Sequence, residues 1–151
     1  MIQIHQLSLS LYSSSRLFIQ LIQSSLNELN LTYPQYLVLS VLWEEDGLKV
    51  NEIGKRLHLD SGTLTPLLKK LEAMNFVKRQ RGEADERTVH VELTYPGKSL
   101  QSKVQEVLNP LNEKFIQASE LNLPDLNHSL MNLLDSIEIL KNLTSNGKTN
   151  Y

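Results

Sequence analysis

Apolar residues recur along most of this chain at the three- and four-residue spacing that is typical of amphipathic helices. The first run predicts a helix from Ile4 to Leu29, followed by a break at residues 30–32. Its apolar positions are Leu7, Leu11, Phe18, Leu21, Ile22, Leu26 and Leu29. They spread over more than one stripe of the helix, so we expect burial on more than one side, with one side against a second subunit.

A second helix begins at a recognisable start signal. Thr32 has the side-chain oxygen of an N-cap, and Pro34 lies in the first turn, where its missing N–H costs nothing. The pattern continues to Trp43, and the acidic run 44–47 closes the helix. A short extended piece at 48–50 precedes a third helix, which is marked by Ile53, Leu57 and Leu59.

The stretch 60–72 is the most informative part of the chain. Asp60 or Ser61 can cap a helix N-terminus, and apolar residues at positions 64, 67, 68 and 71 form one buried stripe. A second stripe carries Ser61, Thr65 and Lys69. Their hydroxyls and charge suit close approach to a phosphate backbone. The alternative is an ordinary amphipathic helix with a solvated face, and Pro66 counts against a regular helix because it lacks a backbone donor.

Two strands with a charged connection come next. Residues 76–81 predict one strand, and Thr88–Leu93 predicts a second with strict alternation of apolar and polar side chains. Residues 82–87 join the two strands as a hairpin tip. The third helix, a short turn and the helix at Ser61 make a helix-turn-helix, so the hairpin that follows is a wing. Arg87 at its tip is placed to reach a minor groove.

Two further helices complete the predicted fold. Thr94 caps the first, which Pro110 kinks or ends, and residues 121–124 open the second, which stays apolar to Leu143. The fold class is mainly α with a small β-hairpin wing, that is, a winged helix-turn-helix plus dimerisation helices. We expect a single domain over 1–151, with a DNA-binding lobe at 32–94 and dimerisation helices at 4–30 and 95–143.

Charge supports this division of the chain. The net charge is −2, but residues 47–98 hold ten Lys/Arg against seven Asp/Glu, and the remainder holds five against ten. The absence of cysteine excludes disulfides, thiolate zinc sites and thiol nucleophiles. No apolar run approaches the ~18–20 residues that cross a bilayer, and no basic segment precedes the first apolar residues. We therefore expect a cytoplasmic protein with no membrane contact.

Catalytic and metal sites find no support in the sequence. The four histidines lack partners at helical metal-ligand spacing, the serines at 13–15 have no His/Asp partners, and the glycines form no phosphate loop. The acidic run 44–46 closes a helix, and adjacent residues on a helix do not face each other. We predict no enzyme activity, no catalytic residues, no metal and no cofactor.

Five segments together resemble the MarR family of winged-helix regulators, and most closely its organic-hydroperoxide and oxidation-sensing repressors. They are Leu31–Tyr36, Leu42–Glu44, Leu59–Glu72, Asp85–Arg87 and Leu93–Thr94, within a match that covers about residues 6–97. The resemblance implies a homodimer with interlocked first and last helices. It also implies a pseudo-palindromic double-stranded DNA operator, with recognition helices in successive major grooves and wings in the flanking minor grooves.

The resemblance also assigns roles to individual residues. The groove-facing set it implies is Ser61, Gly62, Thr63, Thr65, Pro66 and Lys69. Lys70 and Arg79 correspond to DNA-backbone contacts, Arg87 to the wing arginine, and Asp85 to a residue that steadies the wing by pairing with a nearby arginine. Arg81 joins the basic cluster of this lobe, and a surface for docking proteins does not require such a cluster.

One departure from the family pattern concerns the signal. Ser8 stands where oxidation-sensing relatives carry a reactive cysteine, while Tyr12 and Tyr33 resemble the tyrosines around that thiol and Ile22 occupies a third tyrosine position. A serine hydroxyl forms neither a sulfenic acid nor a disulfide. The sequence therefore predicts a dimeric repressor without thiol-based sensing. Two alternatives remain: a repressor released by a small aromatic effector near Tyr12 and Tyr33, and a winged-helix module for protein–protein contact.

Overall fold

The computed structural model describes residues 3–85, 87–118 and 120–146. It divides into two compact units, residues 1–111 and 112–151, and each is described by itself. Unit 1 holds the elements from α1 to most of α5, and unit 2 holds the end of α5 and α6. The predicted boundaries at 32–94, 4–30 and 95–143 stay a prediction.

The long first helix is present, with a tighter last turn than expected. α1 spans Ile4–Leu26 and continues into the 3₁₀ turn η1, Asn27–Leu29. Asn30 then adopts the left-handed conformation (φ 54°), which ends the run. Only the end of α1 enters the core of unit 1, through Ile22 and Leu26.

The predicted cap of the second helix is confirmed. α2 spans Tyr33–Glu44, and the N–H of Gln35 donates to Oγ1 of Thr32 at 3.4 Å. In return the N–H of Thr32 donates to Oε1 of Gln35 at 2.9 Å, which completes a capping box. Two otherwise orphaned donors are thus satisfied at the start of this buried helix.

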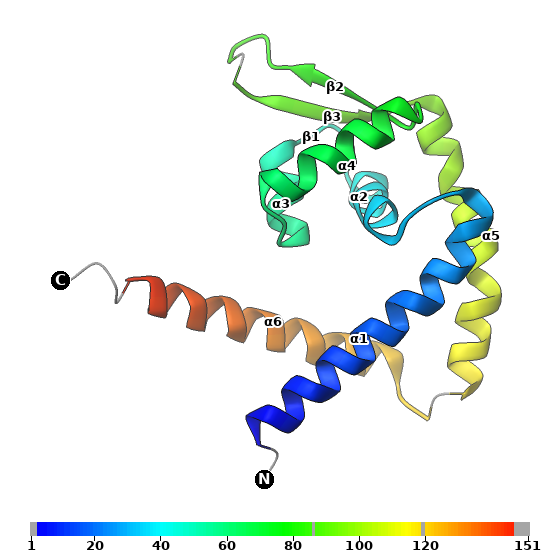
Figure 1. Cartoon of the computed structure of the whole chain (residues 1–151), viewed down its shortest axis with the longest axis vertical. Coiled ribbons are helices and arrows are strands. Elements are labelled where there is room, and N and C mark those ends of the chain that lie inside the picture. The colour runs from blue at the N-terminus through cyan, green and yellow to red at the C-terminus, as the bar shows by residue number, and fades with distance from the viewer. Residues whose placement is uncertain (1–2, 86, 119, 147–151) are drawn as a thin grey trace. The chain divides into compact units, whose positions relative to one another are not determined.

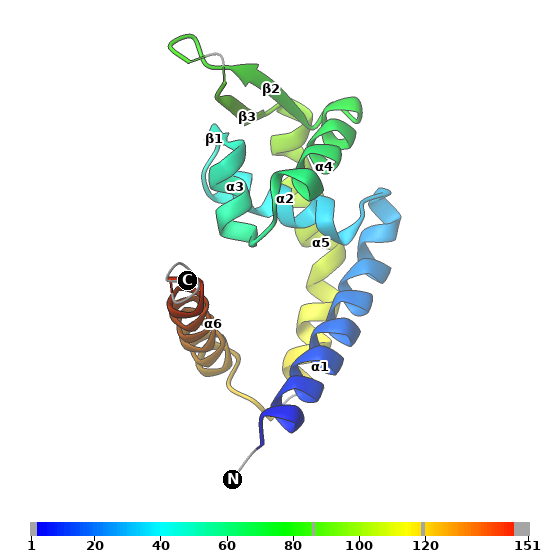
Figure 2. The ribbon, with the colours of Figure 1, turned by 60° about the vertical axis from the view of Figure 1, so that its left-hand side comes forward.

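The hairpin is confirmed, and a third strand joins it. β2 (Val77–Arg81) and β3 (Val89–Leu93) pair antiparallel, and β1 (Leu48–Lys49) pairs with the other side of β3, giving the order β1-β3-β2. The extended piece expected at 48–50 is therefore a short strand, except that Val50 already belongs to α3. The free end of the hairpin projects beyond helices α3 and α4 (Figures 1 and 2).

Two helices form the predicted helix-turn-helix. α3 spans Val50–Leu57 and α4 spans Ser61–Ala73. The expectation that Pro66 disfavours a regular helix is wrong, because α4 runs through it. The buried stripe Leu64, Leu68 and Leu71 anchors α4 on a core shared with α2, α3 and the sheet, so packing outweighs one missing backbone hydrogen bond.

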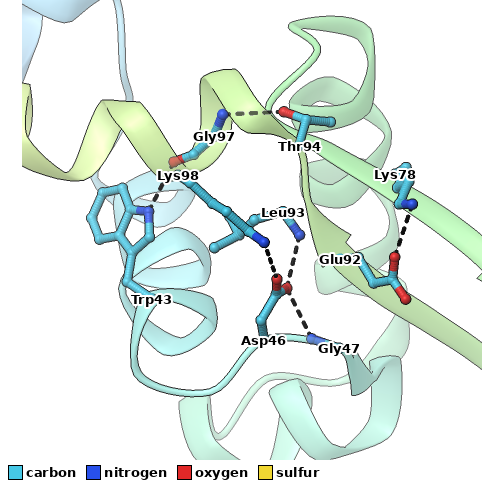
Figure 3. A network of polar contacts seen from close by, with 9 residues as sticks. All are labelled: Trp43, Asp46, Gly47, Lys78, Glu92, Leu93, Thr94, Gly97 and Lys98. Carbon is cyan, nitrogen blue, oxygen red and sulfur yellow. Dashed lines mark hydrogen bonds and ion pairs between the residues drawn. The ribbon is translucent and has the colours of Figure 1, made fainter.

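Polar contacts join the base of the sheet to α2 and to the start of α5 (Tyr95–Ala118), as Figure 3 shows. The indole N–H of Trp43 donates to the carbonyl of Gly97 at 2.9 Å, and Oδ1 of Asp46 accepts from the N–H of Leu93 at 2.8 Å. Gly97 has to be glycine, since a Cβ there would lie 2.0 Å from the carbonyl oxygen of Phe76.

Unit 2 consists of the end of α5 and of α6, joined through the non-helical residues 120–122 among those described. α5 runs through Pro110 to Ala118, so this proline does not end the helix, and the kink expected as the alternative stays a prediction. α6 spans Leu123–Asn146, and Oδ1 of Asn122 accepts from the N–H of Asp125 at 3.3 Å, as expected for a helix that opens at 121–124. Within the described ranges, no helix combines the length and the apolar character needed to span a bilayer.

Candidate nucleic-acid interface

The turn that presents α4 depends on close backbone packing. His58 ends α3 in the left-handed conformation (φ 53°), and the N–H of Leu59 donates to the carbonyl of Gly54 at 2.9 Å. A Cβ on Gly54 would lie 2.8 Å from the carbonyl oxygen of Leu59. Glycine at 54 thus permits the close approach that sets the angle between the two helices of the motif.

A carboxylate occupies the N-terminus of α4. Oδ1 of Asp60 accepts from the N–H of Thr63 at 2.7 Å, which identifies Asp60 rather than Ser61 as the cap. Hydrogen bonds from the backbone and hydroxyl of Thr63 hold the pKa of the Asp60 carboxyl below its usual range. The charge-assisted cap stabilises the helix, but its negative charge competes with the phosphate binding expected from these N–H groups.

The predicted groove-facing residues lie on the solvent side of α4. Thr65 is half-buried, and the exposed members are Ser61, Gly62, Thr63, Pro66 and Lys69. Lys70, predicted as a DNA-backbone contact, is exposed as well. Leu64, Leu68 and Leu71 occupy the opposite side. One face of α4 is therefore committed to the core, and the other presents small polar groups followed by two cations.

The wing carries further cations with different surroundings. Lys78 forms an ion pair with Glu92 at 3.0 Å on the adjacent strand. Arg81 and Arg87 are exposed. Arg79 is engaged by Glu72 of α4: its Nε and Nη2 donate to Oε2 at 3.0 and 2.7 Å. These hydrogen bonds lower the pKa of the Glu72 carboxyl.

Backbone hydrogen bonds shape the tip of the hairpin. The N–H of Gly82 donates to the carbonyl of Thr88 at 2.8 Å, and the N–H of Thr88 donates to the carbonyl of Asp85 at 3.0 Å. The expected role of Asp85, to steady the wing by pairing with a nearby arginine, stays a prediction. Its Oδ1 accepts from the backbone N–H of Arg87 at 3.0 Å, a contact that steadies the turn and leaves the Arg87 guanidinium exposed.

The suggested sensor residues are not brought together within one chain. Ser8 and Tyr12 lie one turn apart on the exposed surface of α1. The backbone N–H of Tyr33 donates to Oε1 of Gln23 at 2.7 Å, eleven residues further along the same helix than Tyr12. That separation is about 16 Å along the helix axis. The expectation that Tyr33 comes near Ser8 and Tyr12 is therefore wrong for a single protomer.

A family of known proteins matches this lobe. The family described as Transcriptional regulator SarA/Rot matches residues 20–107, more than half of the chain. The chain belongs to this family. Its MarR-type winged-helix members are transcriptional regulators and not enzymes, which confirms the predicted non-enzymatic, DNA-binding class.

Curated relatives of this SarA/Rot family protein are transcriptional regulators, one of them named for organic hydroperoxide resistance. The organic hydroperoxide resistance transcriptional regulator of Bacillus subtilis (strain 168) is 41% identical over 133 residues, covering 88% of this chain and 90% of the relative. The regulator SarZ of Staphylococcus aureus (strain USA300) is 39% identical over 129 residues, covering 85% and 86%. TtmR of Methylorubrum extorquens (strain PA1) is 54% identical over 99 residues, which is 66% of this chain and 51% of TtmR.

Solved structures agree with this membership. Reduced AbfR bound to DNA aligns with a TM-score of 0.76 at 38% identity, covering 90% of this chain and 91% of AbfR. AbfR of Staphylococcus epidermidis aligns at 0.79 with 36% identity, covering 91% and 92%. MarR aligns at 0.71 with 23% identity, covering 88% of this chain and 97% of MarR, which supports the fold alone.

Several residues that position the SarA/Rot-type lobe escaped the sequence analysis. Gln23 uses its amide to bond the turn before α2, since its Nε2 donates to the carbonyl of Leu31 at 2.9 Å. Glu72 accepts hydrogen bonds from the middle of β2, and Asp46 accepts one from the end of β3, so each carboxylate holds one strand of the wing. Glu72 is flanked by Leu71 and Ala73, and this isolated charge was the one available signal, whereas Asp46 ends the acidic run 44–46 and carried none. Which strand each carboxylate meets depends on the fold.

Proposed function

We propose that this protein is a dimeric cytoplasmic repressor that binds a pseudo-palindromic operator, with α4 in the major groove and the hairpin tip in the adjacent minor groove. The observation that carries the proposal is the set of exposed polar and basic residues on the solvent side of α4 and on the wing, both within unit 1. It combines small hydroxyl side chains with Lys69, Lys70, Arg81 and Arg87. Small groups allow close approach to base edges, and the cations neutralise phosphates.

A second copy of the chain is part of the proposal. α1 exposes apolar side chains on several sides, including Leu9 at 66%, Leu17 at 61% and Phe18 at 45%. α6 exposes Ile139 at 60% and Leu140 at 61%. Large apolar side chains exposed on this scale are unusual on a monomer. These helices support dimerisation, and a two-fold dimer binds a two-fold operator.

Thiol chemistry has no place in this repressor. AbfR has been solved in a disulfide-formed state and in an overoxidised state bound to DNA. The present chain has no cysteine, so neither product can form within it. We propose that hydroperoxide does not release it from its operator through a thiol.

Footprinting on the promoter next to the protein's own gene tests the proposal. We expect two protected half-sites, one or more helical turns apart, and an affinity that falls steeply between low and physiological salt. Each neutralised phosphate contributes about −0.9 to the slope of log K against log salt concentration. A footprint that is insensitive to salt would rule out this surface as the DNA-binding face.

The sensing part has its own test. In a gel shift with cumene hydroperoxide, we expect the wild-type protein to stay on its operator. Ser8→Cys introduces the missing thiol, and Ser8→Ala is the matched control without one. Partial release of the Ser8→Cys variant alone would agree with the proposal, whereas release of the wild-type protein at low micromolar peroxide contradicts it.

A further inference from the structure

Arg79 differs from its neighbour Lys78 in the direction of its side chain. In the β2–β3 register, Arg79 lies opposite Val91 and Val77 opposite Leu93. Directly paired residues share a face of the sheet, and Val91 is fully buried. Arg79 therefore extends from the inner face, toward α4, whereas Lys78 and its partner Glu92 lie on the outer face.

Glu72 meets Arg79 at two places at once. One carboxylate oxygen, Oε1, accepts from the backbone N–H of Arg79 at 3.2 Å, and the other, Oε2, accepts from Nε and Nη2 of its guanidinium. β2 is an edge strand in the order β1-β3-β2, so this N–H points away from β3. The carboxylate thus takes the place of a neighbouring strand at an edge that would otherwise stay open.

This contact joins α4 to the wing, the two parts of the lobe that carry the proposed DNA-binding residues. Glu72 lies in the last turn of α4, and Arg79 is the central residue of β2, with the hairpin tip beyond it. The side chains are 37% and 28% exposed, so water screens the pair only in part. A guanidinium that donates two charge-assisted hydrogen bonds to one carboxylate oxygen is also a poor candidate for a separate phosphate contact.

We infer that Glu72 and Arg79 are positioning residues that lock the angle between the recognition helix and the wing, so that Arg87 reaches DNA only while the pair is intact. The inference rests on the proposed operator binding. It replaces the phosphate contact expected for Arg79 with an indirect role. Its consequence is that the carboxylate of Glu72 favours DNA binding although its charge alone opposes it.

The sign of the Glu72→Gln effect distinguishes the two roles. In anisotropy titrations with a labelled operator duplex, we expect Glu72→Gln to bind about tenfold more weakly, the size of one lost groove contact. Glu92→Gln removes the same charge from the outer face of the sheet and is the matched control, which we expect to bind at least as well as wild type. Tighter binding by Glu72→Gln would overturn the inference, because it would mean that the carboxylate only competes for Arg79.

Variants of Arg79 supply a second readout. We expect Arg79→Gln and Arg79→Lys to lose about tenfold alike, since lysine keeps the charge but not the forked geometry, and to keep the wild-type salt slope. A slope reduced by about 0.9 in Arg79→Gln, with Arg79→Lys near wild type, would identify a phosphate contact and overturn the inference. This comparison of the two Arg79 variants does not involve Glu72→Gln, so it holds even if that variant does not fold. Thermal unfolding of each variant is recorded first to confirm that it is folded.

The effect of Arg87→Ala in two backgrounds tests whether the position of the wing depends on the Glu72–Arg79 pair. We expect Arg87→Ala to weaken binding about tenfold in the wild-type background and by less than twofold in the Glu72→Gln background. Equal losses in both backgrounds would show that the wing is placed without the pair and would overturn the inference. If the wild-type protein binds no operator duplex at all, the proposed function fails and the inference falls with it.

Discussion

The DNA-binding lobe and the last helix differ in how they dispose of apolar side chains. In unit 1, helices α2 and α4 together with the sheet bury a shared core that includes Val38, Leu39, Leu64 and Val91, each fully buried. α6, of similar apolar pattern, has no buried residue and exposes Leu143 at 65%. A similar helical spacing of apolar residues thus leads to buried side chains in unit 1 and to exposed side chains on α6. The DNA-binding lobe buries its apolar side chains within itself, whereas α6 leaves its apolar side chains exposed for contact with another surface.

The largest effect on stability is expected from a substitution in the buried core of the DNA-binding lobe. Leu68 is 1% exposed, and Leu68→Ala should lower the free energy of unfolding by about 3 kcal/mol, because a cavity replaces its buried side chain. Thermal unfolding followed by circular dichroism measures the loss. Leu67→Ala, a half-buried neighbour on α4, is the control and should lose clearly less. Equal losses would mean that the two sides of α4 are not packed differently.

The exposed helix predicts a different response. Leu140 is 61% exposed, so Leu140→Glu should leave the fold of one chain intact but place a charge in the proposed dimer contact. We expect dimer dissociation to become about a hundredfold easier, near 2.7 kcal/mol, measured by sedimentation equilibrium. Asn142→Glu adds the same charge at an exposed polar position of α6 and should remain dimeric. A wild-type protein that sediments as a monomer at micromolar concentration would remove the contrast between the two regions.

The same contrast explains how far the sequence could be interpreted alone. Thr32 was predicted as a cap, and the second cap was narrowed to Asp60 or Ser61, because capping depends on residues within one turn. The hairpin followed from alternation, which is also local. Pro66 was misjudged as unfavourable to a regular helix, since the packing that keeps α4 continuous involves residues distant in sequence. α5 likewise continues through Pro110, which the sequence predicted to kink or end it.

The site shows the same limit. The exposed cations at 69, 70, 81 and 87 could be predicted from pattern and resemblance. The engagement of Arg79 by Glu72 could not, because it depends on the register of β2 against α4. The separation of Tyr12 from Tyr33 likewise required the direction of α1 relative to α2. Local chemistry was predictable, and pairings across elements were not.

A smaller effect is expected at the turn that presents α4. Gly54→Ala should lower the free energy of unfolding by about 1 kcal/mol, since the strain of a Cβ 2.8 Å from the Leu59 carbonyl exceeds the gain in helix propensity. The loss in the free energy of operator binding should exceed the loss in the free energy of unfolding, because the turn sets the angle of the recognition helix. In thermal unfolding, Gly62→Ala is the control: its Cβ would meet only the end of the Asp60 side chain, at 3.3 Å. A Gly54→Ala variant as stable as wild type would show that the turn yields without cost.

The smallest effect expected is a dependence of the stability of the DNA-binding lobe on acid pH. The hydrogen bonds of Arg79 hold the pKa of Glu72 below its usual value, and those of Thr63 do the same for Asp60. A carboxyl with a depressed folded-state pKa contributes stability that is complete above its unfolded pKa, about 4, and is lost as the pH falls through the folded pKa. We therefore expect the difference in melting temperature between wild type and Glu72→Gln to be full at pH 7 and to shrink below about pH 4, as the wild-type carboxyl becomes protonated. Glu92→Gln, whose ion pair with Lys78 is more exposed, should show little difference at any pH. A Glu72→Gln difference that stays constant down to pH 3 would mean that the charge of Glu72 adds nothing to the stability of the lobe.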